Sequence, residues 1–307
     1  MTGAKFDMVT ILGPTASGKT EVAVNLTLRL GGEIISADSR QIYRDMDLGT
    51  GKDIEEYRIG EVDVPYHLID IADAGYQYNV FEFQRDFLKV YHSIRERGKF
   101  PVMCGGSGMY LEAILKGYRL IQVPVNEVRR NELQQLSLDE LTEILKHYKS
   151  LNNTSDTENK KRAIRAIEIE EFCQIHPETD LSFPQIKSLI VGVKYDRDSR
   201  RRRITARLKQ RLDNGMIEEV KKLIDKGLKP EELTYYGLEY KYLTLFITGK
   251  LSYDEMLTGL NTAIHQFAKR QMTWFRKMER DGFEIKWLDG YMPLDEKTDK
   301  IISWLNP

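Results

Sequence analysis

The chain has 307 residues, and its 46 Lys and Arg nearly balance its 47 Asp and Glu, which gives a formal net charge of −1. This balance excludes a protein that is basic over its whole surface, but it allows local basic patches. No run of about 18 apolar residues occurs and the first residues, MTGAKFD, lack an apolar signal region, so we expect a soluble, cytoplasmic protein. Cys104 and Cys173 have no partner at metal-binding spacing, and we expect both thiols to be buried and reduced.

The first motif in the chain is GPTASGKT, residues 13–20, which matches the phosphate-loop pattern in full. An apolar run over 8–12 precedes it, as a buried parallel strand would, and helical spacing over 19–30 follows it. Backbone N–H groups of such a loop bind phosphate, Lys19 can reach a terminal phosphate, and the Thr20 hydroxyl can ligate Mg²⁺. The motif therefore predicts a phosphate site made by Gly13, Thr15, Ala16, Ser17, Gly18, Lys19 and Thr20.

Strand and helix patterns alternate after the phosphate loop. A short apolar strand at Ile34 and Ile35 ends at Asp38, a second buried strand is expected over 66–71, and Asn79 is placed to cap a helix. Residues 100–117 again combine a strand, a glycine turn and a helix. This alternation predicts an α/β fold with a parallel sheet, whose strand ends would gather the phosphate loop, Asp38 and the turn at 105–107 at one edge.

The pattern changes after residue 120. Residues 121–184 are polar and helical, and we interpret them as a small helical insertion domain in a phosphate-loop core made of 1–120 and 185–307. The sheet is expected to resume over 188–196 and to end with a strand over 283–288. Helical patterns in between cover 198–213, 216–226, 238–248 and about 253–280.

Two polar positions follow strands of the expected sheet. Asp38 is either a metal ligand or general base, or a simple turn cap, and the polar side chains of Ser39, Arg40, Gln41 and Tyr43 behind it suit a heterocycle edge. Ser107 either faces a ligand at the glycine turn or merely caps the next helix. The strand over 101–104 runs into glycines and not into the carboxylate that a plain ATPase usually has there, although Asp38 or Asp70 could substitute.

Three basic clusters stand out in the neutral chain, at 160–165, 197–211 and 268–280. Such runs form either solvated helix faces or a footprint for a nucleic-acid backbone, and the aromatic residues in the last cluster suit the footprint. Arg203 and Arg207 lie four residues apart on one helix face, so that one of them can turn toward the phosphate loop.

Taken together, these segments resemble the tRNA dimethylallyltransferases, which prenylate adenosine next to the anticodon. The resemblance covers nearly the whole chain and is closest to the bacterial form of the family. The phosphate loop alone is generic, whereas DSRQIY and KRQMTW are far more specific. The matching segments are GPTASGKT, ISADSRQIYRDMDLGTGK, GGSGMYLEAIL, DTENKKRAIRAIEI, RRRITARL with GMIEEVKKL, and FAKRQMTWFR.

The resemblance implies that the loop binds the diphosphate of dimethylallyl diphosphate with Mg²⁺, and that the insertion holds the anticodon stem-loop of tRNA. It makes Asp38 the general base toward the exocyclic N6 amine of a flipped-out adenine, with Ser107 and Arg207 as further catalytic residues. Ser107 stands where the family usually has Thr, and Arg207 matches an arginine that contacts the diphosphate. The residues implied in tRNA binding are Asp38, Ser39, Arg40, Gln41, Ser107, Arg129, Lys161, Arg162, Arg165, Lys269, Arg270, Gln271 and Arg276.

Two positions depart from the family pattern: Glu239 stands where a basic residue is common, and Ile264 stands where Thr is usual. We expect both on the tRNA side and away from the diphosphate. A small-molecule phosphate-loop kinase, a nucleotide-dependent RNA-binding switch and prenylation of free adenosine phosphates stay open as alternatives. We expect a monomer and no membrane partner.

Overall fold

The computed structural model describes residues 5–151, 156–177 and 182–305. Its contacts divide the chain into two compact units. The first, here called the core unit, is Met1–Tyr118 with Pro184–Pro307, and the second, the insertion unit, is Arg119–Phe183. Each unit has its own hydrophobic core.

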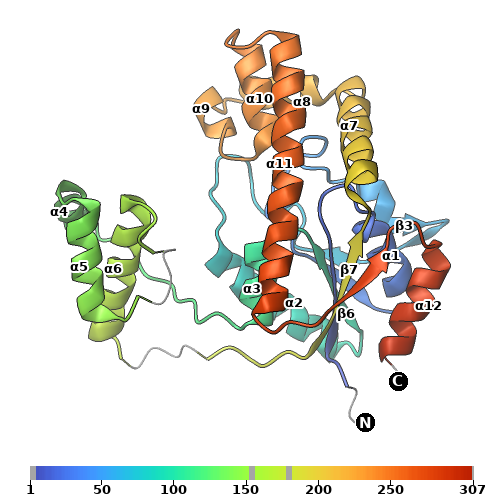
Figure 1. Ribbon diagram of the computed structural model, residues 1–307, viewed down its shortest axis with the longest axis horizontal. Helices are drawn as coiled ribbons and strands as arrows, with labels where there is room; N and C mark the ends of the chain where they lie inside the picture. The colour runs from blue at the N-terminus through green and yellow to red at the C-terminus, as the bar shows by residue number, and fades with distance from the viewer. Residues whose placement is uncertain (1–4, 152–155, 178–181, 306–307) are drawn as a thin grey trace. The chain divides into compact units, whose positions relative to one another are not determined.

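The core unit is built on a sheet of six strands, shown with its helices in Figure 1. Every pairing in this sheet is parallel, and the central strand is buried along its whole length, which explains the apolar run MVTIL. The predicted parallel α/β fold is therefore confirmed. In spatial order the strands are Tyr66–His67 (β5), Glu33–Ser36 (β2), Pro101–Gly105 (β6), Met8–Leu12 (β1), Ser188–Lys194 (β7) and Ile285–Asp289 (β8).

Helices cover both faces of the sheet. The connection from β1 to β2 contains α1 (Lys19–Leu30), and the connection from β2 to β6 contains α2 (Val80–Glu96). Because these crossovers run in opposite directions along the sheet and such crossovers are right-handed, α1 and α2 lie on opposite faces. Asn79 caps α2 in a capping box, as predicted, and α3 (Gly108–Leu115) follows β6 and packs on α2.

Four of the helices that follow β7 agree with the sequence prediction to within one residue at each end. They are α7 (Arg197–Asp213), α8 (Met216–Asp225), α10 (Leu238–Ile247) and α11 (Tyr253–Arg280). The last helix, α12 (Leu294–Leu305), packs beside α1 and was not predicted, because its first two turns are polar. The other unpredicted elements are too short to show a period: Ile54–Tyr57 (η1), Arg58–Ile59 (β3), Val62–Asp63 (β4) and Pro230–Leu233 (α9).

The insertion unit contains three helices among its described residues: α4 (Glu127–Gln135), α5 (Leu138–Tyr148) and α6 (Lys160–Ile175). Leu133, Leu141, Leu145 and Ile167 meet in its interior and are fully buried. The helical character predicted for this segment is confirmed. None of the helices in the described ranges is long and apolar enough to cross a membrane.

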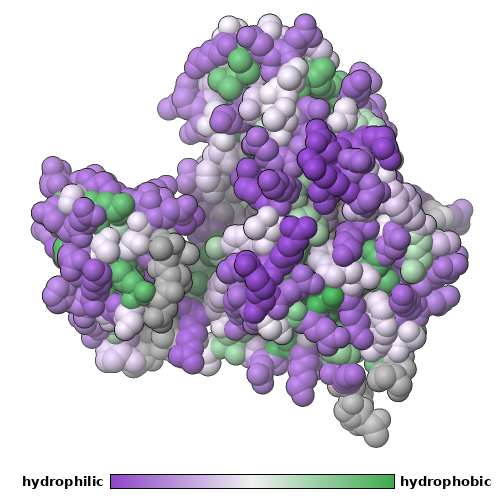
Figure 2. Space-filling model, viewed as in Figure 1, coloured by the Kyte–Doolittle hydropathy of each residue, from purple (hydrophilic) through white to green (hydrophobic). Residues whose placement is uncertain are grey.

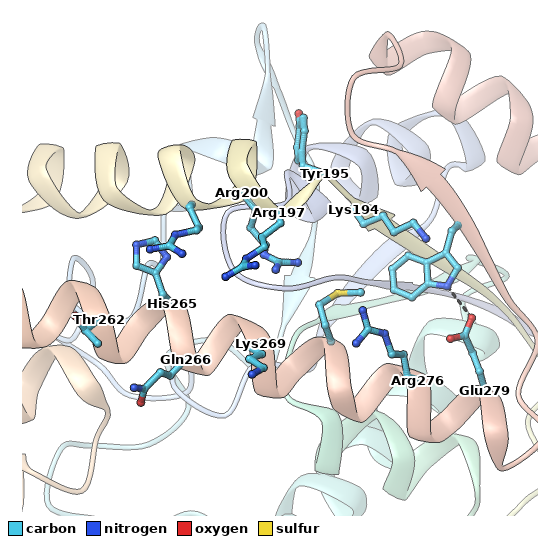
Figure 3. Close-up of a pocket in the computed structure, with 13 residues that line it drawn as sticks. Lys194, Tyr195, Arg197, Arg200, Thr262, His265, Gln266, Lys269, Arg276 and Glu279 are labelled. Carbon is cyan, nitrogen blue, oxygen red and sulfur yellow. Dashed lines mark hydrogen bonds between the residues drawn. The ribbon is translucent and has the colours of Figure 1, made fainter.

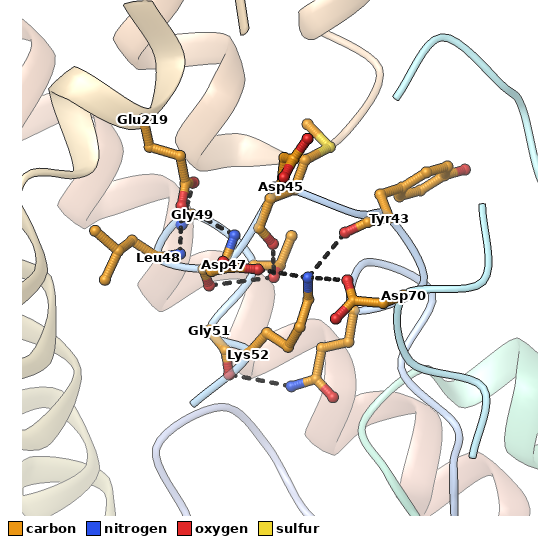
Figure 4. Close-up of polar contacts among 12 residues, drawn as sticks. Tyr43, Asp45, Asp47, Leu48, Gly49, Gly51, Lys52, Asp70 and Glu219 are labelled. Carbon is orange, nitrogen blue, oxygen red and sulfur yellow. Dashed lines mark hydrogen bonds and ion pairs between the residues drawn. The ribbon is translucent and has the colours of Figure 1, made fainter. Parts of the chain in front are cut away.

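The strand predicted over 66–71 was wrong in length, because only Tyr66 and His67 pair with β2. Leu68 and Asp70 adopt left-handed backbone angles, with φ of 61° and 56°, so the chain turns away from the sheet. This turn brings the Asp70 carboxylate to the ammonium of Lys52, as Figure 4 shows.

Lys52 holds together the long loop between β2 and η1. Its side chain is fully buried, and its ammonium donates to Tyr43 O at 2.9 Å and to Asp47 at 2.5 Å, in addition to Asp70. From outside the loop, the Glu219 carboxylate of α8 accepts the backbone N–H groups of Asp47, Leu48 and Gly49 at 2.7–3.0 Å (Figure 4). These contacts fix the loop that runs from Asp38 to Asp53.

We predict that Lys52→Met lowers the free energy of unfolding by about 1–3 kcal/mol, because a buried carbonyl and two carboxylates lose their shared donor. The estimate is below that for a fully buried pair, since Asp47 and Asp70 are partly exposed and can be hydrated. Chemical denaturation monitored by circular dichroism measures the change. Lys99→Met, at an exposed position without an ion pair among the described residues, is the control and should change stability by less than about 0.5 kcal/mol. Equal midpoints for Lys52→Met and the wild type would contradict this role.

Candidate active site

The phosphate loop connects β1 to α1 and has a left-handed backbone at two positions, Ala16 with φ 60° and Gly18 with φ 75°. Gly13 has to be glycine, since a Cβ there would lie 2.5 Å from Ser17 Oγ and 2.7 Å from Val193 O. The buried Ser17 hydroxyl has no hydrogen-bond partner in the described structure. A loop of this shape that contains a buried hydroxyl without a partner is typical of an anion site.

Gln271 braces the phosphate loop against the second glycine turn. Its Oε1 accepts the Thr15 N–H at 2.9 Å, and its Nε2 donates to Gly106 O at 2.9 Å. The side chain comes from the middle of α11 and is buried. Sequence reasoning implied that Gln271 contacts tRNA, but its amide is already used at both ends. Gln271 also lines the cavity that contains Asp38, and its contact with tRNA stays a prediction.

Asp38 and Ser107 lie at the ends of neighbouring strands β2 and β6. Asp38 Oδ1 accepts the Arg40 N–H at 3.0 Å, so one oxygen caps the turn, while Oδ2 makes no hydrogen bond to the described residues. The Ser107 hydroxyl accepts the Ser39 N–H at 2.9 Å and contacts Ser39 Oγ at 3.1 Å. It does not cap α3, so the simple helix-cap interpretation of Ser107 was wrong. Asp38 retains one oxygen able to accept a proton.

Two cavities meet at the phosphate loop. One, here called the Asp38 cavity, has a volume of about 570 Å³ and is lined by Asp38, Ser107 and Trp274. The other, the phosphate-loop cleft, has a volume of about 1050 Å³ and is lined by Ser17, Gly18 and η1. The side chains that line both are Lys19, Thr20, Arg207 and Arg211. A phosphate chain on the loop would therefore be in reach of groups that face Asp38.

The basic face of α7 lies beside the phosphate loop. Arg203 donates to Ala16 O at 3.0 Å, whereas Arg207 and Arg211 pair with Asp53. Burial raises the pKa of Asp53, but Arg211 and Arg207 outweigh it and hold that pKa below its usual range. The sequence-based expectation that one of Arg203 and Arg207 turns to the phosphate loop is confirmed for Arg203, and Arg207 lines the same cleft.

Glu239 and Ile264 do not lie away from the phosphate loop, so that expectation was wrong. Both line the Asp38 cavity and also a small recess against Thr15, Ala16 and Arg207. Burial raises the pKa of Glu239, against the opposing charges of Arg211 and Arg40. The sequence position was misjudged because the turn before α10 folds back over the loop that follows β2, where Arg40 donates to Tyr235 O at 2.7 Å.

The remaining polar residues implied in tRNA binding fall into different surroundings within the core unit. Gln41 is tied into its own loop by Gly51 O at 3.1 Å and by Ser36 Oγ at 3.2 Å. Arg270 lines the Asp38 cavity, whereas Lys269 and Arg276 face a separate groove on the other side of α11. The sequence places these three cations on one helix but does not show that they face different cavities on its two sides.

Three of the four cations of the insertion unit that are implied in tRNA binding are paired with carboxylates. Arg129 binds Glu171 at 2.7 Å and Glu132 at 2.9 Å, and Arg165 binds Glu168 at 3.2 Å. Arg162 pairs with Glu158, and Lys161 is exposed. Their contact with tRNA stays a prediction.

Sequence reasoning missed Lys52, Asp53, Arg211 and Glu219 as residues that shape the site. The motif DLGTGK contains Lys52, but nothing in it indicates burial, and Glu219 looks like an ordinary helix-surface residue. Cys104 is buried as expected, but Cys173 is only partly buried. Within the described ranges, no three His, Cys, Asp or Glu side chains gather into a metal-holding group.

Comparison with known proteins places this chain in one family. The IPP transferase family model matches residues 41–278, and the Isopentenyl transferase model matches residues 6–62. A protein named tRNA dimethylallyltransferase 2 from Bacteroides fragilis is 62% identical over 97% of this chain and 97% of its own length. Another of that name from Phocaeicola vulgatus is 59% identical over 98% of each chain.

A solved structure agrees with these relatives. The crystal structure of the full-length tRNA isopentenylpyrophosphate transferase from Bacillus halodurans matches with a TM-score of 0.71 and 32% identity, covering 97% of this chain and 95% of that one. The predicted enzyme class, a transferase, is thereby confirmed. The chain belongs to the IPP transferase family, the family of the tRNA dimethylallyltransferases.

Proposed function

We propose that this protein transfers the dimethylallyl group of dimethylallyl diphosphate to the exocyclic N6 amine of the adenosine 3′ of the anticodon in tRNA. The observation that carries the proposal is a single cavity that is lined by the phosphate-loop residues Lys19 and Thr20 and by Asp38. The diphosphate end of the donor would occupy the loop, and the adenine would enter from the Asp38 side.

In the reaction, the bond from N6 to the allylic carbon forms while the bond from that carbon to the diphosphate oxygen breaks. The N6 amine is a poor nucleophile, and Asp38 accepts its proton as the new bond forms. Lys19, Arg207 and the loop N–H groups bind the diphosphate that leaves with the bonding electron pair. Because the adenine has to reach a cavity inside the core unit, it flips out of the anticodon loop at a cost of a few kcal/mol.

Oxygen donors suited to Mg²⁺ surround the phosphate loop. Thr20, Asp53 and Glu56 line the same cleft as Lys19, and hydroxyl and carboxylate oxygens are the ligands that this ion prefers. Thr20 would hold the ion together with diphosphate oxygens. When bound, Mg²⁺ supplies charge that neutralises the departing diphosphate.

The tRNA is bound as a whole anticodon stem-loop. The insertion, residues 121–184, contacts it through Arg129, Lys161, Arg162 and Arg165. Arg162 exchanges an exposed ion pair with Glu158 for a phosphate at little cost, whereas Glu168, the partner of Arg165, is buried and keeps Arg130 as a second partner. In the core unit, Ser39, Arg40 and Arg270 lie at the Asp38 cavity where the flipped base enters. The protein acts as a monomer in the cytoplasm.

Nucleoside analysis tests the proposal. The purified protein is incubated with Mg²⁺, labelled dimethylallyl diphosphate and unmodified tRNA with adenosine 3′ of the anticodon, and the tRNA is then digested. Label on that adenosine is the expected result. Label on free adenosine phosphates only, phosphorylation of a small molecule with consumption of ATP, or tRNA binding that depends on ATP or GTP without chemistry would each overturn it in favour of an alternative.

We predict that Asp38→Asn lowers the single-turnover rate of prenyl transfer by at least about 100-fold, the usual contribution of a general base. Its amide oxygen can still accept the Arg40 N–H, so tRNA affinity should stay within a few-fold of the wild type. Rapid-quench kinetics and filter binding measure the two effects. Asp289→Asn is the matched control, since Asp289 Oδ1 also accepts an N–H two residues ahead, at 3.0 Å, but lies outside the cavity. A lost affinity with an unchanged rate would reject the role of Asp38.

We also predict that Arg207→Gln lowers kcat/KM for dimethylallyl diphosphate by about 100-fold, because a donor to the developing diphosphate charge is lost. Both the affinity for the donor and the chemical rate should fall, whereas the affinity for tRNA should not. Lys209→Gln, on an exposed position of the same helix, is the control. A defect confined to KM for tRNA would place Arg207 on the RNA side instead.

A further inference from the structure

Three arginines of α7 lie four residues apart on the side of the helix that faces the phosphate loop. Arg203 donates to a carbonyl of the loop, and Arg207 and Arg211 line both the phosphate-loop cleft and the Asp38 cavity. The arginines at the start of the same helix face elsewhere, because Arg197 and Arg200 point toward α11 across a basic groove, as Figure 3 shows. Arg211 therefore belongs to the phosphate-loop side of α7 and not to the groove.

The Arg211 side chain is enclosed within the core unit. It is 13% exposed, against 30% for Arg207, whereas other hydrophilic side chains gather on the surface over α7 and α11 in Figure 2. The guanidinium packs on the backbone of Gly51, where a Cβ would overlap it. Gly51 lies in the loop that Lys52 and Glu219 fix, so the guanidinium has a defined place. A cation enclosed in this way is not available to a nucleic-acid backbone on the surface, but it is available to a ligand in the two cavities.

The positive charge of Arg207 and Arg211 is only partly neutralised. Both donate to one atom, Asp53 Oδ2, Arg211 at 3.1 Å, and Asp53 is the one carboxylate within 4 Å of either guanidinium among the described residues. Burial and the charge of Arg207 lower the pKa of Arg211, and Asp53 and Glu239 offset this only in part. The other N–H groups of Arg211 have no hydrogen-bond partner in the described structure. An enclosed guanidinium with unused donors costs stability in the free protein, so a bound anion is expected to use them.

We infer that Arg211 binds the diphosphate of the donor directly, as a second guanidinium beside Arg207. Residues four apart on a helix are separated by about 6 Å along its axis, so each of the two side chains can bind one of the two phosphates. A guanidinium presents two parallel N–H donors to a phosphate, which suits the unused donors of Arg211. Because Arg211 lines both cavities, its charge lies between the phosphate loop and Asp38, where negative charge develops as the allylic bond breaks. The inference rests on the proposed function for the identity of the diphosphate.

Calorimetric titration with inorganic diphosphate and Mg²⁺, in the absence of tRNA, tests this contact. We expect Arg211→Gln to bind inorganic diphosphate at least about 10-fold more weakly than the wild type, because a charged hydrogen-bond donor is lost. The affinity for tRNA, measured by filter binding, should stay unchanged. Lys209→Gln removes one charge from an exposed position of the same helix and is the control, which should bind inorganic diphosphate like the wild type.

A double variant separates direct contact from an effect that acts through Arg207. If Arg211 itself touches the diphosphate, the variant with both Arg207→Gln and Arg211→Gln should bind it at least several-fold more weakly than Arg207→Gln alone. Equal affinity of these two variants would overturn the inference and make Arg211 a residue that positions Arg207. Wild-type affinity in Arg211→Gln would also overturn it, since the side chain would then serve the structure only.

A second variant covers the case in which Arg211→Gln does not fold. Arg211→Lys keeps a positive charge beside Asp53 but loses the two parallel donors, so a smaller loss of affinity for inorganic diphosphate is expected, and wild-type affinity would overturn the inference. Failure of the proposed function is distinguishable, because the titration needs neither tRNA nor prenyl transfer. The wild type would then bind inorganic diphosphate with the help of Arg211 but leave tRNA unprenylated.

Discussion

The parallel pairing of β1 with β6 and β7, and of β6 with β2, is the constraint on which the site depends. Parallel strands end at one edge, so Leu12 lies opposite Gly105 and Gly192, and Ser36 lies opposite Cys104. The segments that leave these four strands are the phosphate loop, the turn with Asp38, the turn with Ser107 and the start of α7. The sheet alone therefore brings residues that are far apart in the chain to one edge.

The strands bring these segments together, but buried polar side chains fix their shape. Gln271 joins the phosphate loop to Gly106, and Lys52 and Glu219 hold the loop after Asp38 from both sides. Each of these groups satisfies backbone atoms that the sheet leaves unpaired, and such contacts are costly to lose in a buried place. The reacting groups therefore sit on loops with fixed geometry, a condition for placing an amine next to an allylic carbon. Helix α11 links this frame to the basic groove on its other side.

Sequence reasoning could predict the elements whose signal is local. The phosphate loop, the parallel sheet, the capped start of α2 and the helices α7, α8, α10 and α11 all follow from a short motif or from periodicity within one segment. Sequence reasoning failed where contacts between residues far apart in the chain determine the local structure. Leu68 and Asp70 turn out of the sheet toward Lys52, Gln271 is buried by two loops, and Glu239 and Ile264 are brought to the phosphate loop by the turn before α10. No period or motif in the sequence encodes those partners.

Which molecule occupies the phosphate loop is the central question, and a binding titration tests it most directly. The measurement is the affinity of a non-reactive thio analogue of dimethylallyl diphosphate, with Mg²⁺ and with ATP as competitor, for the wild type and for Lys19→Ala. The account predicts that the analogue binds, that ATP does not displace it, and that Lys19→Ala loses it. Tighter binding of ATP, with displacement of the analogue from the loop, would contradict the account and indicate that the phosphate loop binds a nucleotide.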